Sequence, residues 1–261
     1  MTHMVYLPFS YAALGQWSGR RRLMRQGVFD EGYALHVLLS GVFGKGVLQP
    51  FRTFRPSRAQ EATLYAYSDL EERTLRAVSE VAAPPDCLEV IDVAGLRAKP
   101  MPARFSVGQR LGFDIRVRPV RRLAQNLPDS QSAKVIRKGS EIDAFRLELL
   151  RRSPNGWKDR EVAPEAGISR EEVYAKWLAE RLTGAAAVDL HSCRLASFRR
   201  LRVIRGDGCG PEGPDSVLHG ECVVEDPAAF AATLAKGVGR HRAYGYGMLI
   251  VRPPDTSPRS G

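Results

Sequence analysis

The sequence predicts an α+β protein with two tandem ferredoxin-like (RRM-like) βαββαβ domains, and two observations lead to this prediction. Residues 4–93 read in order as strand, helix, two strands, helix and strand, which is the order of the split βαβ unit. Residues 113–251 repeat the same six elements with more insertions. We therefore expect a first domain over residues 1–94, a linker over 95–112, a second domain over 113–253 and a disordered tail over 254–261.

The elements of the first half follow from hydrophobic period and turn residues. Residues 4–9 are expected to form the first strand, and residues 30–43 form a helix that Asp30 caps. Leu35, Leu38 and several neighbours recur at helical spacing, so they form the buried side of that helix. The remaining predicted elements are strands over residues 47–55, 61–68 and 88–93, and a helix over 69–81.

A strongly basic segment, residues 16–26, lies between the first strand and this helix. It contains Arg20, Arg21, Arg22 and Arg25. Blocks of like charge are usually solvated, so we expect a loop here. The alternative is an arm that contacts phosphate groups.

In the second half, residues 113–120 are predicted to form a strand and residues 142–152 a helix. Ser169 and Glu172 have the spacing of a capping box, which predicts the start of a further helix. The remaining predicted elements are strands over residues 188–204 and 217–224, a helix over 226–236 and a last strand over 247–251.

The chain is strongly basic, with a net charge of +10 and a pI of about 9.8. Such a charge is typical of proteins that bind nucleic acid. A membrane surface would also attract it, but we find no apolar run long enough to span a bilayer and no signal peptide. The four cysteines form no C-x-x-C pair, so we expect a reduced, cytoplasmic protein.

Residues 237–249 contain four glycines and the basic side chains of Arg240, His241 and Arg242. Glycine lets a backbone approach a ligand closely, and successive free N–H groups can form a concave anion site. The segment is therefore a candidate phosphate or nucleotide site. A glycine-rich turn with solvated charges fits the same pattern equally well.

The order of residues in this segment resembles the closing glycine-rich loop of the CasE family, the CRISPR repeat-RNA endoribonucleases of type I-E systems. The segment reads Gly-Val-Gly-Arg-His-Arg-Ala-Tyr-Gly-Tyr-Gly-Met-Leu. The resemblance extends to residues 220–236, which look like the family's last strand and helix. Residues 113–121 resemble the strand that opens its second domain.

Tyr33 and His36 lie one turn apart on the helix predicted over residues 30–43, beside its apolar side. A lone histidine in such a place is more often a packed or surface residue. However, Tyr-Ala-Leu-His followed by hydrophobic residues and Phe43 resembles the catalytic helix of CasE-like enzymes. The resemblance implies that His36 is catalytic and Tyr33 is its partner, and it leaves open which is the acid and which the base.

In the CasE family the glycine-rich loop packs near the catalytic helix, across the two domains. The resemblance therefore implies that four residues of the loop lie close to the scissile or an adjacent phosphate, namely Gly237, Gly239, Arg240 and Arg242. His241 has no counterpart in this argument, and a surface position is favoured for it over a phosphate contact.

The densest run of arginines falls on the strand predicted over residues 188–204. Strand alternation puts Arg200 and Arg202 on one face, opposite Arg199 and Leu201. In the family a basic hairpin of the second domain engages the major groove of the repeat stem-loop, and this run, with Arg194, is its best match. The alternative is a solvated edge strand that its charges protect from aggregation.

No metal and no cofactor are expected. His191, Cys193, Cys209, His219 and Cys222 form two loose clusters that lack a recognisable zinc-site spacing. Cysteine in an apolar strand is commonly a small buried residue. The sequence also lacks a Walker loop and an acidic cluster that would hold catalytic magnesium.

The resemblance as a whole implies a metal-independent endoribonuclease that cleaves CRISPR repeat RNA at the 3′ base of its stem-loop. The products would carry a 2′,3′-cyclic phosphate and a 5′-hydroxyl. Its partners would be the crRNA stem-loop and other subunits of the type I-E surveillance complex, Cascade, including the backbone protein of the crRNA filament. The competing interpretation is a non-catalytic subunit of the same fold that caps an RNA stem, and the Tyr33–His36 pair favours the enzyme.

Overall fold

The first sheet has four antiparallel strands in the order β2-β3-β1-β4. A computed structural model describes residues 1–24, 27–56, 60–102, 104–129, 134–152, 167–205, 208–209 and 212–254. Burial alternates along the strands, so one face of the sheet packs on the core. The strands are β1 (His3–Ser10), β2 (Phe51–Phe54), β3 (Glu61–Ser68) and β4 (Arg97–Pro100).

The second sheet follows the same plan. Its order is β10-β14-β5-β15, and β11 also pairs with β14. With β10 and β11 in the place of β2, this is the strand order of the first sheet, and the predicted pair of ferredoxin-like folds is confirmed. The strands are β5 (Arg110–Val117), β10 (Ala186–Val188), β11 (Arg194–Leu201), β14 (Gly213–Val224) and β15 (Leu249–Arg252).

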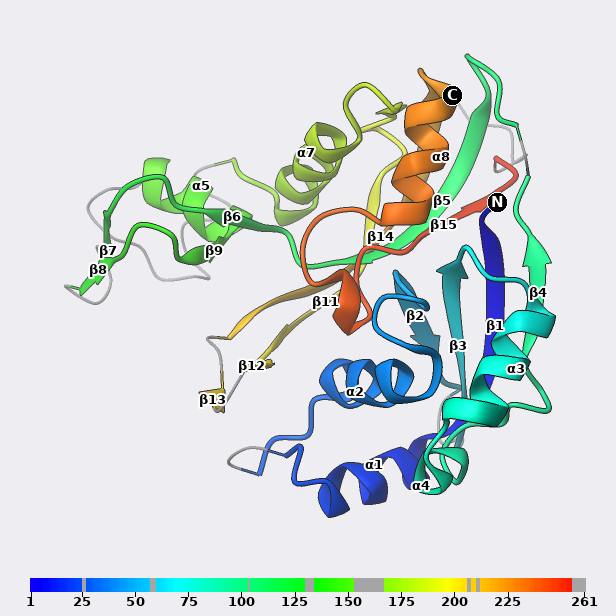
Figure 1. Ribbon diagram of the computed structural model, residues 1–261. Coiled ribbons are helices and arrows are strands. Elements are labelled where there is room, and N and C mark those ends of the chain that lie inside the picture. The colour runs from blue at the N-terminus through cyan, green and yellow to red at the C-terminus, as the bar shows by residue number, and fades with distance from the viewer. Residues whose placement is uncertain are drawn as a thin grey trace.

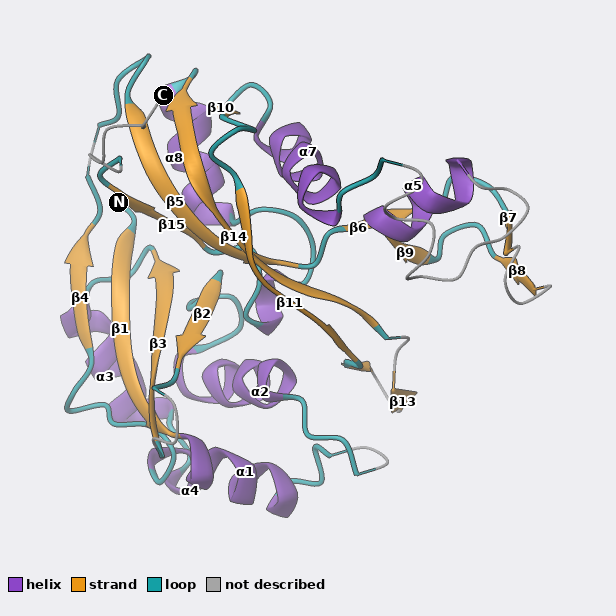
Figure 2. Ribbon diagram, turned by 180° about the vertical axis from the view of Figure 1, so that it is seen from behind, coloured by secondary structure: helices purple, strands orange, loops and turns teal. Residues whose placement is uncertain are grey.

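Helices cover one face of each sheet and leave the opposite face open, as Figures 1 and 2 show from opposite sides. The buried side chains form two clusters, one under each sheet. The helices of the first half are α1 (Tyr11–Arg20), α2 (Glu31–Phe43), α3 (Glu72–Ala82) and α4 (Pro85–Leu88). Those of the second half are α5 (Ala144–Arg152), α7 (Arg170–Leu182), α8 (Pro227–Lys236) and the 3₁₀ turn η1 (Arg242–Tyr244).

Short two-stranded ladders decorate the second half. They pair β6 (Val120–Arg122) with β9 (Glu141–Asp143), β7 (Leu127–Asp129) with β8 (Lys134–Ile136), and β12 (Ile204–Arg205) with β13 (Gly208–Cys209). The strand predicted over residues 188–204 is thus divided among β10, β11 and β12. The capping box predicted for α7 does not form, because the Ser169 side chain makes no capping hydrogen bond.

The expectation of a loop over residues 16–26 was wrong for its first part, which is the end of α1. Ser10 caps this helix by accepting a hydrogen bond from the backbone N–H of Ala13 (3.2 Å). Leu14 and Trp17, one turn apart, are both buried. The two large apolar side chains therefore pack this helix against the core. The helix was not predicted because the arginines at its end made the segment look like a solvated loop.

The arginines at the end of α1 are held by carboxylates of the chain itself. Arg20 lies 2.6 Å from Glu89, and Arg21 lies 2.7 Å from Asp86. Both ion pairs are largely exposed, so they contribute little to stability. Arg25 lies outside the described residues.

The strand predicted over residues 88–93 was also wrong. In this stretch Ile91 makes an isolated bridge to Phe9, and the fourth strand of the sheet is β4. This strand falls inside the segment that was expected to be a linker, residues 95–112. The first sheet therefore extends further along the chain than the sequence suggested.

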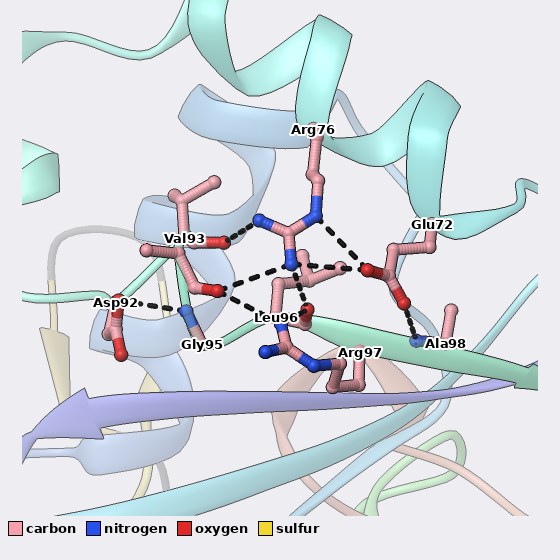
Figure 3. Close-up of polar contacts among 9 residues, drawn as sticks. Glu72, Arg76, Asp92, Val93, Gly95, Leu96, Arg97 and Ala98 are labelled. Carbon is pink, nitrogen blue, oxygen red and sulfur yellow. Dashed lines mark hydrogen bonds and ion pairs between the residues drawn. The ribbon is translucent and has the colours of Figure 1, made fainter.

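A side chain explains why the strand starts late. Arg76 on α3 donates hydrogen bonds to the carbonyl oxygens of three residues, Val93 (2.8 Å), Ala94 (3.2 Å) and Leu96 (Figure 3). Glu72, its ion-pair partner one turn earlier, accepts a hydrogen bond from the backbone N–H of Ala98 (3.0 Å). Carbonyl groups that could join a sheet ladder are bonded to a guanidinium instead.

We expect Arg76→Ala to lower the free energy of unfolding by about 1–3 kcal/mol, because several partly buried carbonyls lose their donor. Arg73→Ala is a matched control, since Arg73 lies on the same helix and is exposed. It should change the free energy by no more than about 0.5 kcal/mol. Urea titrations of both variants check this, and equal stabilities would show that the Arg76 contacts do not hold this segment.

Candidate active site

Helix α2 presents Tyr33 and His36 on its flank. Asp30 caps the helix, and its Oδ1 atom accepts a hydrogen bond from the backbone N–H of Tyr33 (3.0 Å). The apolar side of the helix is fully packed, with Leu35 and Leu38 among its buried residues. Tyr33 and His36 are partly exposed beside that side, as the helical spacing predicts.

The glycine-rich loop follows α8 and folds back on itself. The backbone N–H of Val238 donates to the carbonyl of Gly247 (2.8 Å), and the N–H of Gly247 donates to the carbonyl of Arg116 on β5 (2.7 Å). Gly247 has a φ of 79°, and a Cβ there would overlap the Val238 carbonyl, so only glycine fits this closure. The loop is thus a fixed structure joined to the second sheet.

The glycine-rich loop places Tyr244 against α2, the helix that carries Tyr33 and His36. The ring centroids of Tyr244 and His36 lie 5.0 Å apart at 65°, and those of Tyr244 and Tyr33 lie 6.5 Å apart. Gly32 makes this approach possible, because a Cβ there would overlap the Tyr244 carbonyl. Figure 1 shows η1 beside α2. Residues more than 200 positions apart in the sequence therefore form one cluster, which comprises Tyr33, His36 and Tyr244.

Sequence reasoning missed Tyr244 as a site residue. The available signal was its place as the aromatic residue between Ala243 and Gly245, in the segment that carried the family resemblance. Lys45 was missed as well. It is exposed in the turn after α2, and it contributes to the electrostatics of His36.

The environment of His36 favours its neutral form. Burial lowers the pKa of His36 below its usual value, and the positive charge of Lys45 lowers it further. A larger fraction of the imidazole is therefore uncharged near neutral pH than in a solvated histidine. A neutral imidazole can accept a proton, so the site can supply a general base.

A cavity of about 740 Å³, the glycine-loop cavity, opens beside Tyr244. Arg240 and Arg242 are both exposed on its wall. Arg240 lies 2.5 Å from Glu141, and Arg242 donates a hydrogen bond to the carbonyl of Lys236 (2.8 Å). These arginines give the cavity a positive wall suited to an anion.

Gly237 and Gly239, which were predicted to lie close to a phosphate, are also required for the structure of the loop. The N–H of Gly237 donates to the Thr233 carbonyl (2.8 Å) and closes helix α8, so it is not free for an anion. Gly239 has a φ of 77°, and a Cβ there would lie 2.9 Å from the Trp177 ring. Gly239 also lines the glycine-loop cavity, and Gly237 does not.

The surface position favoured for His241 was wrong. Its side chain is only 6% exposed, and its Nε2 atom lies 3.0 Å from Oε2 of Glu141 on β9. Its backbone is left-handed, with a φ of 65°. The sequence run Arg-His-Arg suggested uniform exposure, but the left-handed turn directs the middle side chain inward and ties the loop to β9.

The predicted basic hairpin is formed by β11 and β14. Arg194 and Arg199 have side chains 64% and 62% exposed, and Arg200 and Arg202 are exposed as well. The predicted alternation was wrong only at Arg202. Arg199, Arg200 and Leu201 lie in a regular part of the ladder with β14, but β11 ends at Leu201. The hairpin still presents four arginines to solvent.

Two contacts fix this hairpin. Arg199 lies 2.6 Å from the buried carboxylate of Asp215, which Arg116 also holds at 2.7 Å. Burial alone would raise the pKa of Asp215, but the two guanidinium groups outweigh it and keep that pKa below its usual range. At the far end of the hairpin, the N–H of Ile204 donates to Oδ2 of Asp30 (2.8 Å). Asp30 thus joins the hairpin to the start of α2.

The cysteines pack as apolar residues where their side chains are described. Cys193 and Cys222 are buried in the second core, and burial raises their pKa values to about 12 and 11. Throughout the described residues, no group of three or more His, Cys, Asp or Glu side chains lies close enough to hold a metal ion. None of the described helices is long and apolar enough to cross a membrane.

Residues 16–253 match the family described as CRISPR associated protein. The protein belongs to this family. The match takes in the second sheet, the basic hairpin and the residues of the Tyr33–His36–Tyr244 cluster, and it begins after β1. A comparison with curated proteins gave no match.

Solved structures of CRISPR proteins share the fold along nearly the whole chain. Thermus thermophilus Cse3 bound to an RNA representing a pre-cleavage complex is 19% identical, with a TM-score of 0.58 over 97% of this chain and 99% of that one. Cas6e from Escherichia coli str. K-12 is 17% identical, with a TM-score of 0.56 over 97% and 100% of the two chains. A chain of a CRISPR RNA-guided surveillance complex, pre-nicking, is 17% identical, with a TM-score of 0.50 over 97% and 100%. The CRISPR-associated protein therefore has the fold of these proteins.

Proposed function

We propose that this CRISPR-associated protein is a cytoplasmic, metal-independent endoribonuclease that cuts CRISPR repeat RNA at the 3′ base of its stem-loop. The observation that carries the proposal is the meeting of His36 and Tyr33 with Tyr244 of the glycine-rich loop, beside a cavity lined by arginines. The structurally similar Cse3 was solved with an RNA representing a pre-cleavage complex, and this supports RNA as the substrate.

The chemistry requires only groups that the chain supplies. The ribose 2′-oxygen attacks the neighbouring phosphorus and gives its proton to a base, while the bond from phosphorus to the 5′-oxygen breaks. The departing 5′-oxygen takes a proton from an acid. The products are a 2′,3′-cyclic phosphate and a 5′-hydroxyl, and no water is consumed. His36, whose lowered pKa favours the neutral ring, is suited to be the base, with Tyr33 as its partner.

Positive side chains near the cluster would stabilise the charge that builds on the phosphate. Arg240 and Arg242 line the glycine-loop cavity, and Lys45 lies close enough to act on His36. Fixed cations that face developing charge are a large source of catalysis. The exposed arginines of the β11–β14 hairpin would hold the stem, through Arg194, Arg199, Arg200 and Arg202.

The protein would remain on its product as a subunit of the type I-E surveillance complex. The fold of a chain in a CRISPR RNA-guided surveillance complex supports this part of the proposal. Its partners would be the crRNA stem-loop and the backbone protein of the crRNA filament. Incubation of the purified protein with its repeat RNA in the presence of a chelator tests the function, since a subunit that only caps the stem would bind and leave the RNA intact.

The rate of cleavage should rise with pH, with an inflection at a lower pH than a solvated histidine would give. A general base works when it is neutral, and burial and the charge of Lys45 lower the pKa of His36. Lys45→Gln should move the inflection to higher pH, because a cation that lowers this pKa is removed. Lys99→Gln on β4 serves as the control.

Single-turnover rates between about pH 4.5 and 8 measure this effect. A rate that falls as pH rises through the inflection would assign His36 the role of acid instead. An inflection that Lys45→Gln leaves in place would show that Lys45 does not act on the reacting histidine.

A further inference from the structure

A second pocket, of about 400 Å³, shares Arg240 with the glycine-loop cavity. Its walls come from the segment after β5, from β6 and β9, and from the start of β14. Arg118, Arg122, Ser140, Val203 and Gly213 are among the residues that line it. It therefore lies between the candidate active site and the turn end of the basic hairpin. We call it the Arg118 pocket.

Arg118 is an unusual wall residue because it is only 4% exposed. Its Nε and Nη1 atoms are shielded from solvent and have no hydrogen-bond partner among the described residues. Its guanidinium lies 5.7 Å from the ring centroid of Tyr246 and donates a hydrogen bond to the Tyr246 hydroxyl. Buried donors without acceptors carry a free-energy cost of a few kcal/mol, so they call for an explanation.

Arg116, two residues earlier, is a second buried arginine, and its hydrogen bonds differ from those of Arg118. Its guanidinium stacks on the same Tyr246 ring at 4.6 Å, and it forms two hydrogen bonds with Asp215, of 2.7 and 3.0 Å. Within the part of the chain that the structure describes, a carboxylate holds Arg116 and none holds Arg118. The inward carboxylates of the Arg118 pocket are already engaged with other groups.

Those engaged carboxylates are Glu141 and Asp143. Glu141 holds Arg240 and His241, and Asp143 accepts hydrogen bonds from Arg170 (3.0 Å) and Tyr174 (2.9 Å). The third acidic residue on the wall, Glu212, is exposed to solvent. A guanidinium donates several N–H groups in a plane and suits the oxygen atoms of a phosphate group.

We propose that the Arg118 pocket binds a phosphate group of the RNA strand, held by Arg118 with Arg122 and Arg240. This rests on the proposed function, and it adds an anchoring point to it. A strand whose scissile phosphate lies at His36 would pass along the glycine-loop cavity, reach the Arg118 pocket and continue to the hairpin. A free phosphate ion has the same chemistry, and the experiment below separates the two sources.

The test compares three variants in binding to a repeat stem-loop over a range of salt concentrations. Arg118→Met removes the charge and keeps the length of the side chain, and Arg122→Ala removes a cation at the rim. Arg121→Ala is the matched control, because Arg121 is adjacent on β6 but pairs with Glu180 at 2.7 Å and does not line the pocket. Thermal unfolding of the parent and of Arg118→Met is measured with and without inorganic phosphate.

Arg118→Met and Arg122→Ala should each weaken binding by about 10- to 100-fold, as expected for a lost hydrogen bond to a charged group. Each should also flatten the slope of log affinity against log salt by about 0.7–0.9. Arg121→Ala should do neither. Arg118→Met should keep or raise the melting temperature of the free protein, because a buried donor without an acceptor is removed.

Wild-type affinity and salt slope in both pocket variants would overturn the RNA assignment. If inorganic phosphate then raises the melting temperature of the parent and not of Arg118→Met, the ligand is a free anion. If phosphate also has no effect and Arg118→Met melts earlier, Arg118 is a structural partner of Tyr246 and the pocket proposal fails. A parent protein that does not bind the stem-loop would refute the proposed function itself. Should Arg118→Met not fold, the pair Arg122→Ala and Arg121→Ala decides the question.

Discussion

Replacing His36 with alanine is expected to slow cleavage of the repeat stem-loop by about 10²–10⁴-fold or more, because that is the usual contribution of a positioned proton-transfer group. Binding should change little. The positive groups proposed to hold the RNA lie on the hairpin and the glycine-rich loop, and the substitution leaves them in place. His36 is partly exposed and lies off the packed side of α2, so its loss should not unfold the helix.

Single-turnover cleavage in chelator, paired with an equilibrium binding curve, measures both effects on the parent and on His36→Ala. His191→Ala is the control, because His191 is exposed and is not part of the Tyr33–His36–Tyr244 cluster. Wild-type cleavage by His36→Ala would exclude this histidine as the acid or base. A lower melting temperature with binding and cleavage lost together would make it a structural residue.

Gly32→Ala is expected to reduce cleavage by about 100-fold without weakening the fold of the first sheet. A Cβ at this position would overlap the Tyr244 carbonyl, so the glycine-rich loop must move away from α2. A displacement of about 1 Å in a reacting group can cost 10²-fold in rate. The effect should therefore fall on the rate and not on the free energy of the isolated helix, where alanine is favoured over glycine.

Gly41→Ala provides a matched control on the same helix. A Cβ at Gly41 would meet no atom within 4 Å, and Gly41 is exposed. This variant should keep full activity and gain up to about 1 kcal/mol of stability from helix propensity. Equal cleavage by Gly32→Ala and Gly41→Ala would show that the contact between α2 and Tyr244 is not needed for catalysis.

The parts of the fold that depend on local signals could be predicted from the sequence. Helix α2 has its cap at Asp30 and its apolar residues at helical spacing, and the predicted element agrees with the structure within one residue. Helix α8 also has a clear capping residue, Asp226, and its predicted bounds agree equally well with the structure. The repeated order of elements then gave the pair of ferredoxin-like folds, because this order is that of the split βαβ unit.

The errors arose where a distant side chain decides the local structure. Arg76 on α3 donates hydrogen bonds to the carbonyls of Val93, Ala94 and Leu96, and no pattern within that segment indicates this contact. The inward turn of His241 depends on Glu141, one hundred residues earlier. In α1 only two apolar residues, Leu14 and Trp17, are fully buried, which is too few for a clear helical hydrophobic pattern. The arginines at its end therefore led to the prediction of a loop.

The candidate site was found mainly through the family resemblance. Residue type and spacing alone would leave His36 as an ordinary partly buried histidine, since the loop that faces it lies about two hundred residues later in the chain. The same distance concealed Tyr244 and the link from Asp30 to the hairpin. The Arg118 pocket could not be predicted from the sequence either. Only the three-dimensional structure shows that two nitrogens of a buried guanidinium have no partner among the described residues.

The most direct test of the account is the chemistry of the RNA ends after cleavage. The purified protein is incubated with a labelled repeat stem-loop in excess chelator, and the products are examined for their terminal groups. We expect one cut at the 3′ base of the stem, with a 2′,3′-cyclic phosphate on the upstream fragment and a 5′-hydroxyl on the downstream fragment. Intact RNA in the presence of chelator, or a 5′-phosphate on the downstream fragment, would contradict the proposed metal-independent attack by the 2′-hydroxyl.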